Sequence, residues 1–558
     1  MESSIETILD TQKELLDRVG KAISGRSFFA YYPEHPKAYP EDGAIKAQEW
    51  LNGQTGKPFN ELMQTGEESW CGDEVSPFLQ ELLAIKYPYF SPDVLVNKAK
   101  HTQKQWRNAT VDTRVSVLLD SLERIKNRFF DIAFATMHTT GQAFMMSFQA
   151  SGPHASDRAL ETISVGYDEL TKFPETAEWE KPMGKFSIKI QKSWHGMGRG
   201  IGLVIGCSTF PVWNTVPGLY ASLVTGNPVI VKPHPGAILP IAIVVAEIQK
   251  ALVQHGFHTD IVQLAADTNS NPITRHLAEH HDVKIIDYTG GTQFGNYIES
   301  LPGKIVFTEK AGVNSMIIDS FEDIDAAMQN MAFAVSLYSG QMCTAPQNFF
   351  IPKHGIRAGD TTLSFDEVAA KFTKAVKDIA ENPKMGPGTL GAIQSVNTLQ
   401  RVVDAKTLKH GKLLLDSIEM KNEEFPNARI ATPIVIELDA ADKDSFSHEL
   451  FGPIVLLIKT NDTAHSVMLA KEMALAKGAI TCGAYSTDKE TRRHIADEME
   501  EAFTPVAFNL SGPVWMNQNA AFSDFHVTGG NPAGNATFTD TAFIVRRFAW
   551  VGHKEMGV

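Results

Sequence analysis

The segment LYSGQMCTAPQNFFI, residues 337–351, places Cys343 directly after Gly-Gln-Met and ahead of an apolar run that is typical of a strand. A thiol at a change from helix to strand can meet backbone N–H groups that lower its pKa and later hold an oxyanion. Free cysteine is also among the most buried residue types, so core packing is the alternative for this residue taken alone. The setting favours a nucleophile that attacks a carbonyl carbon.

A second candidate catalytic residue is a glutamate at the end of another predicted strand. Glu309 ends the apolar run KIVFTE, and the small residues Ala311 and Gly312 come soon after it. At the carboxyl end of a parallel strand, a glutamate can face a crevice and act as a general base. The alternative for Glu309 is a solvated side chain with no chemical role.

Two further patterns are typical of dinucleotide binding. Lys232 ends the strand-like PVIVK, so its ammonium group would project where cofactor hydroxyls or phosphates bind. The run YTGGT precedes a helix-like segment, where Gly291 and Thr292 could offer backbone N–H groups to a pyrophosphate. A surface lysine and a tight Gly-Gly turn are the alternatives, and no G-x-G-x-x-G fingerprint is present.

The elements that must position these residues alternate from about residue 200. The runs GIGLVIGC and PVIVK are strand-like, whereas VWNTVPGLYASLVTGN and LPIAIVVAEIQKALVQHG are helix-like. The series continues to about residue 309 and predicts a doubly wound parallel sheet that binds a nucleotide. A restart from NSMIID to a helix near 365–380 predicts a second α/β domain, which would carry the Cys343 loop.

Composition excludes several classes of function. The chain has 558 residues, of which 43% are hydrophobic, so it can bury the cores of two or three domains. Its net charge of −14 and the lack of a basic block argue against nucleic acid as a partner. The first residues do not resemble a signal peptide and no window is apolar enough to cross a bilayer, so we expect a cytoplasmic protein without a membrane partner.

The cysteines give no sign of a metal or disulfide framework. The four thiols stand far apart and form no C-x-x-C pair. This spacing predicts free thiols and no zinc site.

Taken together, VIVKP, YTGGT, FTEKAG, SGQMC and ELFGP occur in this order and resemble the aldehyde dehydrogenase superfamily over most of the chain after about residue 90. In that family the cysteine of Gly-Gln-x-Cys is the nucleophile, and a glutamate that ends an upstream strand is the general base. Cys343 follows Glu309 by 34 residues, which is the usual spacing. The resemblance therefore implies these two roles for Cys343 and Glu309.

The same resemblance implies a set of cofactor contacts. Lys232 would hold the adenine ribose, and Gly291 and Thr292 would lie at the pyrophosphate. Glu449 and Phe451 of HELFGP would hold and pack the nicotinamide ribose. The implied reaction is the NAD(P)-dependent oxidation of a small-molecule aldehyde to the acid, through a thiohemiacetal and a thioester, in a homodimer or homotetramer.

Two departures from the family pattern bear on rate and cofactor. Most members have an asparagine before Phe-Pro as the oxyanion donor, but this chain has Thr209 there and Asn214 five residues later. Either Thr209 substitutes, or Asn214 reaches back, or turnover is slow. The family's ribose-binding glutamate is replaced by Pro235, which removes an obstacle to a 2′-phosphate and leaves Lys232 to pair with it. We therefore expect NADP as cofactor, with NAD as the alternative.

Within the superfamily, the run FPVWNTVPGLYASLVTGNPVIVKP and the tail FSDFHVTGGNPAGNATFTD look most like the branch called phenylacetic acid degradation protein PaaN. That likeness implies a semialdehyde of phenylacetate catabolism, free or as a coenzyme A thioester. Two alternatives stay open. Coenzyme A could replace water and give an acyl-CoA, or the chain could be a catalytically weak relative that only binds a nucleotide or thioester.

The pattern and the resemblance divide the chain into four parts. We expect an extension over 1–90 packed on the cofactor domain, the cofactor domain over 91–310 with a bridging segment near 176–198, the catalytic domain over 311–515, and a substrate loop with an oligomerisation strand over 516–558. The tail ATFTDTAFIVRRFAWV alternates apolar and polar residues. This alternation predicts an exposed strand that pairs with a neighbouring subunit.

Overall fold

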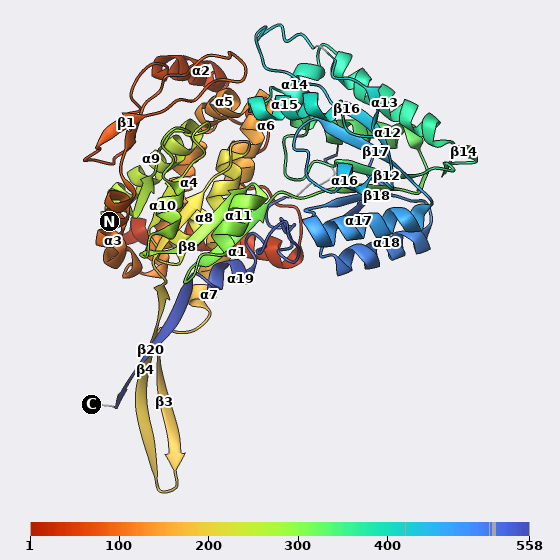
Figure 1. The fold of residues 1–558 in the computed structure, drawn as a ribbon. Helices are drawn as coiled ribbons and strands as arrows, with labels where there is room; N and C mark the ends of the chain where they lie inside the picture. Colours follow the sequence, from red (N-terminus) through yellow and green to blue (C-terminus); the bar gives the residue numbers. More distant parts are fainter. Residues whose placement is uncertain (1, 419, 513, 516–519, 557–558) are drawn as a thin grey trace.

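Two parallel sheets, each covered by helices, lie side by side, and a long antiparallel hairpin projects away from the first of them (Figure 1). The computed structural model describes residues 2–418, 420–512, 514–515 and 520–556. Among these residues, no helix has both the length and the apolar character needed to cross a membrane.

The first sheet has five parallel strands in the order β7-β6-β5-β8-β9. Their bounds are β5 Ile201–Ile205, β6 Val229–Lys232, β7 Val262–Leu264, β8 Val283–Gly290 and β9 Ile305–Lys310. The chain runs outward from β5 to β7 and then returns to the other side of β5 with β8. This reversal creates a crevice at the carboxyl ends of β5 and β8, as in doubly wound folds, and confirms the predicted fold class.

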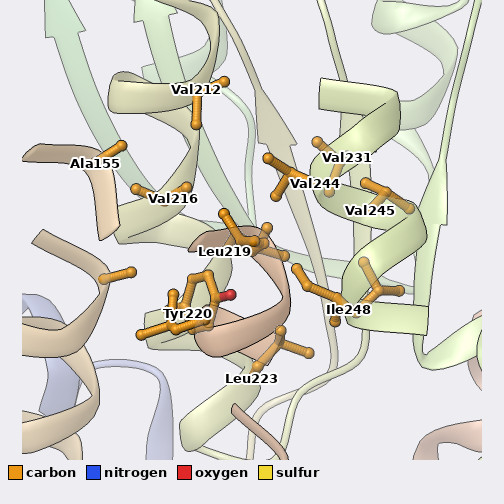
Figure 2. Packing of buried hydrophobic residues seen from close by; sticks show 14 of the residues in the cluster. Ala155, Val212, Val216, Leu219, Tyr220, Leu223, Val231, Val244, Val245 and Ile248 are labelled. Atoms are coloured by element: carbon orange, nitrogen blue, oxygen red, sulfur yellow. The ribbon is translucent and has the colours of Figure 1, made fainter. Parts of the chain in front are cut away.

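Helices bury both faces of this sheet because its strands are apolar on both faces. Helices α8 (Pro211–Val224) and α9 (Leu239–Gln254) pack on one face, where Val216 and Leu219 lie near Val244 and Ile248 (Figure 2). Helices α3 (Pro92–Arg107), α10 (Thr274–Glu279) and α11 (Thr292–Glu299) contact the strands within a second core cluster. Helices α4 (Val111–Lys126) and α7 (Ala155–Thr171) add a further layer.

The second sheet has seven strands in the order β15-β16-β17-β12-β10-β18-β19, all parallel except β15. Their bounds are β10 Ser315–Ile318, β12 Asn348–Pro352, β15 Lys412–Leu415, β16 Ile434–Asp439, β17 Ile454–Thr460, β18 Cys482–Tyr485 and β19 Val506–Phe508. Helices α12 (Ile324–Ser336) and α13 (Phe365–Glu381) share one core cluster with it, and α17 (Thr463–Lys477) and α18 (Lys489–Glu501) share another. The second α/β unit is therefore also as expected.

The first 90 residues pack on the helices around the first sheet. Helix α1 (Glu2–Gly25) contacts α7, and α2 (Gly43–Gln54) contacts α5 (Phe129–Thr140). A short pair, β1 (Ser69–Cys71) and β2 (Tyr87–Tyr89), precedes α3. Between these two strands, the buried Glu74 accepts hydrogen bonds from the backbone N–H groups of Ile238 and Leu239 at the start of α9. Glu74 of the N-terminal extension thus caps α9, a helix that packs on the first sheet.

The projecting part is a three-stranded antiparallel sheet in the order β20-β4-β3 (Figure 1). Its strands are β3 (Thr176–Met183), β4 (Phe186–Gly198) and β20 (Phe548–Met556). The prediction of a continuous strand through the tail is wrong for residues 541–545, which form the short helix α19 (Thr541–Val545). The helix forms because Asp540 caps it and because the guanidinium of Arg547 turns inward to pair with the buried Asp287.

Candidate active site

The loop that carries Cys343 has an unusual backbone. After α12 the chain makes a 3₁₀ turn, Leu337–Gly340, in which Tyr338 (φ 51°) and Ser339 (φ 50°) adopt left-handed conformations. Such residues cost on the order of 1–3 kcal/mol each. Hydrogen bonds from the Tyr338 hydroxyl to the carbonyl of Thr140, and from the Ser339 hydroxyl to two other carbonyls, hold the turn. The loop is therefore fixed by contacts from distant parts of the chain.

A single asparagine fixes the segment around the cysteine. Asn314, just before β10, donates from its side-chain amide to the carbonyls of Cys343 (2.7 Å) and Ala345 (3.0 Å). The thiol of Cys343 is partly buried and lines a cavity together with Thr344. This placement allows a small molecule in the cavity to reach the sulfur atom.

The predicted base lies beside the predicted nucleophile. Glu309 lies near the end of β9 and is 1% exposed. Its Oε2 accepts a hydrogen bond from Nδ2 of Asn214 and lies 3.2 Å from Nε2 of His526. The carboxylate, the Cys343 thiol and the His526 ring each place one donor atom within 4.8 Å of the other two. The fold thus brings together Cys343, Glu309 and Asn214 from three separate elements.

No motif in the sequence pointed to His526 as a site residue. It lies in the tail run FSDFHVTGG, 217 residues after Glu309, and no motif spacing connects the two residues. Trp213 packs edge-on against the imidazole, with ring centres 4.6 Å apart, and Phe538 packs next to both rings. Only the packing of the tail on α8 and β9 shows that this histidine belongs to the site.

The pKa values of Glu309 and Cys343 are shifted in opposite directions. Burial acts to raise the pKa of Glu309, but the charge and hydrogen bond of His526 and the hydrogen bond from Cys343 outweigh burial, so the pKa of Glu309 is lowered. Burial, followed by the nearby Glu309 carboxylate, raises the pKa of the Cys343 thiol well above its ordinary value. The resting site therefore holds a carboxylate next to a protonated thiol, which suits proton transfer from sulfur to Glu309 at the moment of attack.

Asn214 and Thr209, the two candidates for donating a hydrogen bond to the oxyanion, differ in their position relative to the cavity. Among the described residues that line the cavity, Asn214 is present and Thr209 is not. The carbonyl of Thr209 accepts a hydrogen bond from the amide of Gln142. Asn214 extends from the first turn of α8, and its Oδ1 lies 3.6 Å from the sulfur of Cys207 while its Nδ2 contacts Glu309.

The cavity in front of Cys343 has a volume of about 380 Å³ and mostly apolar walls. Polar groups lie among its lining, including an ion pair between Glu34 and His154 (3.0 Å) and the carboxyl group of Asp157. The larger apolar members of the lining are Phe28, Phe29, Met145, Met146, Phe210, Trp213, Phe333, Leu337, Met342 and Trp515. A compact apolar molecule is the natural occupant.

The N-terminal extension supplies part of this wall. Phe28 and Phe29 line the cavity, and the chain next to them is held by Asp157, whose Oδ1 accepts the backbone N–H groups of Tyr31 and Tyr32. The sequence indicated no role for these residues, because nothing in the run SFFAYYPEHP marks it as part of a distant cavity.

We expect the Michaelis constant for an apolar aldehyde to rise as the pH passes through about 8. Burial raises the pKa of Asp157 to about 8, against the lowering effect of the two N–H bonds. The group is therefore neutral below this pH and charged above it, and an apolar molecule that displaces water from a carboxylate loses affinity. Asp157→Asn keeps the acceptor without the charge, so its Michaelis constant should stay level from pH 6 to 9.5. Identical profiles for the two proteins would contradict this assignment.

The predicted cofactor residues lie along the carboxyl edge of the first sheet. Lys232 ends β6, is 2% exposed, and forms an ion pair with Asp267 (2.6 Å), a residue that the sequence did not suggest. Burial lowers the pKa of Lys232, although Asp267 opposes this shift. Gly291 is the N-cap of α11 and Thr292 its first residue; open space surrounds the position of a Cβ on Gly291, so a phosphate group can approach its backbone.

The other two cofactor candidates come from the second sheet. Glu449 and Phe451 lie in the loop before β17, and both are partly exposed. Burial raises the pKa of Glu449 to about 7, against the lowering effect of Arg401. The guanidinium of Arg401 also donates to the carbonyl of Phe451. A buried lysine and an open glycine at a helix N-terminus on the first sheet, together with a carboxyl group before β17 of the second sheet, fit the charges and hydroxyls of a dinucleotide.

Comparisons with known proteins agree with this geometry. The model of the aldehyde dehydrogenase family matches residues 91–532. An N-succinylglutamate 5-semialdehyde dehydrogenase from Pseudomonas fluorescens (strain Pf0-1) is 25% identical over 443 residues, which cover 78% of this chain and 82% of that protein.

Solved structures are similar over nearly the whole chain. The structure of an NAD-dependent aldehyde dehydrogenase from Burkholderia multivorans has a TM-score of 0.96 and 43% sequence identity, with 98% of each chain covered. A 1-pyrroline-5-carboxylate dehydrogenase from Thermus with bound NAD has a TM-score of 0.74 and 18% identity, covering 95% of this chain and 99% of that one, and shows the same fold.

Proposed function

Because this chain belongs to the aldehyde dehydrogenase family, we propose that it oxidises an aldehyde with a compact apolar tail to the carboxylic acid, with Cys343 as nucleophile and Glu309 as general base. The observation that carries the proposal is the meeting of the Cys343 thiol and the Glu309 carboxylate beside an apolar cavity. A weak relative that only binds nucleotide would have no use for this pair.

The first half of the reaction consumes the aldehyde. Cys343 attacks the carbonyl carbon as its proton passes to Glu309, and the oxyanion receives hydrogen bonds from the loop backbone and from the amide of Asn214. A nicotinamide dinucleotide, when bound, accepts the hydride from the tetrahedral carbon. The thioester on Cys343 is the product of this half.

The second half releases the acid. After Glu309 has released the proton of Cys343 to solvent, it takes a proton from a water molecule in the cavity, and this water attacks the thioester carbonyl. The tetrahedral adduct then expels Cys343 as the thiolate, which is protonated again for the next turnover. The lowered pKa of Glu309 keeps the carboxylate ionised and ready to accept that proton. Coenzyme A as the acceptor in place of water would give an acyl-CoA from the same thioester.

The substrate we propose is an aldehyde with an apolar aromatic or medium-length chain next to the carbonyl group, and the PaaN likeness favours a semialdehyde of phenylacetate catabolism, free or as a coenzyme A thioester. The cavity supports a compact apolar tail because Phe28, Phe210 and Trp213 form its walls. A cytoplasmic location and a homodimer or homotetramer stay predictions of the sequence.

The test is dinucleotide reduction by the purified protein with a medium-chain and an aromatic aldehyde, followed by near-ultraviolet absorbance. Aldehyde-dependent reduction with release of the free acid supports the proposal. A protein that binds dinucleotide yet gives no reduction with any aldehyde, while Cys343 reacts with an alkylating reagent no faster than Cys482, would favour the binding module instead.

We expect Asn214→Ala to lower kcat by roughly a hundredfold or more, as loss of an oxyanion donor does, whereas Thr209→Ala should lower it far less. The reason is that Asn214 lines the cavity with Cys343. Steady-state kinetics of both variants, with circular dichroism to check folding, decide between them. A large loss in Thr209→Ala with a small one in Asn214→Ala would reverse the assignment.

The cofactor is a nicotinamide dinucleotide in our proposal, NADP with NAD as the alternative. Pro235 supports NADP because it presents no carboxylate to a 2′-phosphate. The relative from Burkholderia is named NAD-dependent, and a glyceraldehyde-3-phosphate dehydrogenase from Bacillus halodurans with the same fold was solved with NADP.

We expect Asp267→Asn to shift the ratio of kcat/KM values for NADP over NAD upward by roughly tenfold, the factor that about 1.4 kcal/mol gives. Asp267 holds the Lys232 ammonium at 2.6 Å, so its carboxylate repels a 2′-phosphate and neutralises the lysine. Because the ratio compares two cofactors on one protein, a general loss of stability cancels. An unchanged ratio would show that Lys232 does not contact this part of the cofactor.

A further inference from the structure

The three side chains that meet at the nucleophile are also a set of metal ligands. We propose that Cys343, Glu309 and His526 bind a zinc ion. The ion coordinates the sulfur atom of Cys343, so this atom cannot attack a substrate, and the inhibition is reversible. The proposal that zinc binds here rests on geometry alone. The proposal that zinc inhibits aldehyde oxidation rests in addition on the function proposed above.

The distances fit one ion with little movement. Zinc bonds of about 2.0–2.3 Å in a tetrahedron keep ligand atoms roughly 3.3–3.6 Å apart. Nε2 of His526 lies 3.2 Å from Oε2 of Glu309, and the Cys343 sulfur lies within 4.8 Å of one ligand atom of each residue. The sulfur therefore has to approach these atoms by about 1.5 Å at most to complete the set.

The chemistry of the donors selects zinc. A thiolate, an imidazole and a carboxylate are the ligand types that zinc takes in proteins, whereas magnesium and calcium prefer oxygen alone. Three protein ligands leave a fourth position open, and Cys343 and His526 both face the cavity that a water molecule can fill. Binding converts the Cys343 thiol to a thiolate and takes the imidazole of His526 in its neutral form, and the protons that these two groups carry are released to solvent.

The buried side chains of Glu309 and His526 have atoms that could still bind a metal ion. His526 is 4% exposed and Glu309 is 1% exposed. Oε1 of Glu309 and Nδ1 of His526 have no hydrogen-bond partner among the described residues, and Nε2 of His526 has only its close contact with Oε2 of Glu309. Polar atoms buried in this way are costly unless something binds them, and a cation would satisfy both side chains at once.

Neighbouring residues hold the ligands in place. The amide of Asn214 donates to Oε2 of Glu309, and Trp213 packs edge-on against the His526 ring. Such outer contacts orient metal ligands and strengthen binding. The spacing of the cysteines in the sequence predicted no zinc site. That spacing could not reveal this set of ligands, because each of the three ligands comes from a different, distant segment of the chain.

A second cluster provides a contrast within the same chain. His280, His281 and Asp282 lie close together at the surface and contain no thiol. Metal bound there lacks a bond to sulfur, so a spectroscopic probe that reports metal–sulfur bonds tells the two clusters apart.

The experiment titrates Co²⁺, a spectroscopic substitute for zinc, into the purified full-length protein after treatment with a chelator and without cofactor. A near-ultraviolet charge-transfer band marks the bond from thiolate to Co²⁺, and added Zn²⁺ should remove it by competition. Cys343→Ser should lose the band, whereas Cys207→Ser, the control for a nearby thiol, should retain it. His526→Gln should weaken Co²⁺ binding by at least roughly tenfold, the lower limit seen even for loss of an outer contact.

Absence of the band in the unmodified protein, or its survival in Cys343→Ser, overturns the zinc site. An unchanged affinity in His526→Gln and in a second variant, His526→Asn, removes the histidine from the ligand set and with it the proposed site. Zn²⁺ should also inhibit aldehyde oxidation, and a chelator should restore it. A band that behaves as expected in a protein without dehydrogenase activity would leave the metal site standing and refute only the proposed function.

Discussion

Replacing Cys343 by alanine is expected to lower aldehyde-dependent dinucleotide reduction by on the order of 10⁴-fold or more, as removal of a covalent nucleophile does. Without the sulfur atom no thiohemiacetal forms, and no other described thiol lines the cavity. The measurement is single-turnover and steady-state reduction of the dinucleotide, with Cys482→Ala as the control because that thiol is buried in β18 of the second sheet.

The pH profile of the unmodified protein gives an independent check. Because the pKa of the Cys343 thiol is raised well above its ordinary value, its rate of alkylation should climb steadily from pH 7 to 10. Residual activity within tenfold of the unmodified protein in Cys343→Ala would refute the covalent mechanism.

Glu309→Gln is expected to lower steady-state turnover by roughly 10²–10⁴-fold, the usual contribution of a general base. The variant should still reduce about one equivalent of dinucleotide in a first phase, which is itself slowed because Glu309 also accepts the Cys343 proton, and turnover should then stop at the thioester because water is not activated to cleave it. Rapid mixing and mass spectrometry of the intact protein measure the first phase and the acylated Cys343. Glu299→Gln is a matched control, since Glu299 is nearby but pairs with Lys310 at the surface of the strand.

The same variant separates the two acceptors of the thioester. If coenzyme A is the natural acceptor, its addition should restore turnover in Glu309→Gln and yield an acyl-CoA. Full turnover of this variant in water alone would remove Glu309 from the base role.

The alternating elements of the two sheets could be predicted because each strand and helix has its own local signature. GIGLVIGC and PVIVK became β5 and β6, and the long apolar LPIAIVVAEIQKALVQHG became α9. Cys343 and Glu309 could be selected because their motifs occur in the order and spacing that resemble the family, and their catalytic roles stay predictions. Local pattern alone is sufficient only for the fold class.

The rest of the site depends on contacts that no local pattern encodes. His526, Asp267 and the Phe28 wall of the cavity reach the site from segments without a marked motif, through packing that involves the whole chain. The helix α19 was missed because its short apolar run alternates like a strand, whereas the pairing of Arg547 with Asp287 fixes the chain differently. Tertiary contacts decided these positions.

The projecting sheet has a consequence for how the protein behaves on dilution. Within the described part of the chain, β3 and β20 each pair on one side only, and most of the side chains of β3 and of the outer half of β20 are exposed. A small antiparallel sheet without its own core is marginally stable in water. If a second copy covers it, the sheet gains stability in proportion to the logarithm of protein concentration, so a dilute sample should be cleaved by proteases in this hairpin long before either parallel sheet opens.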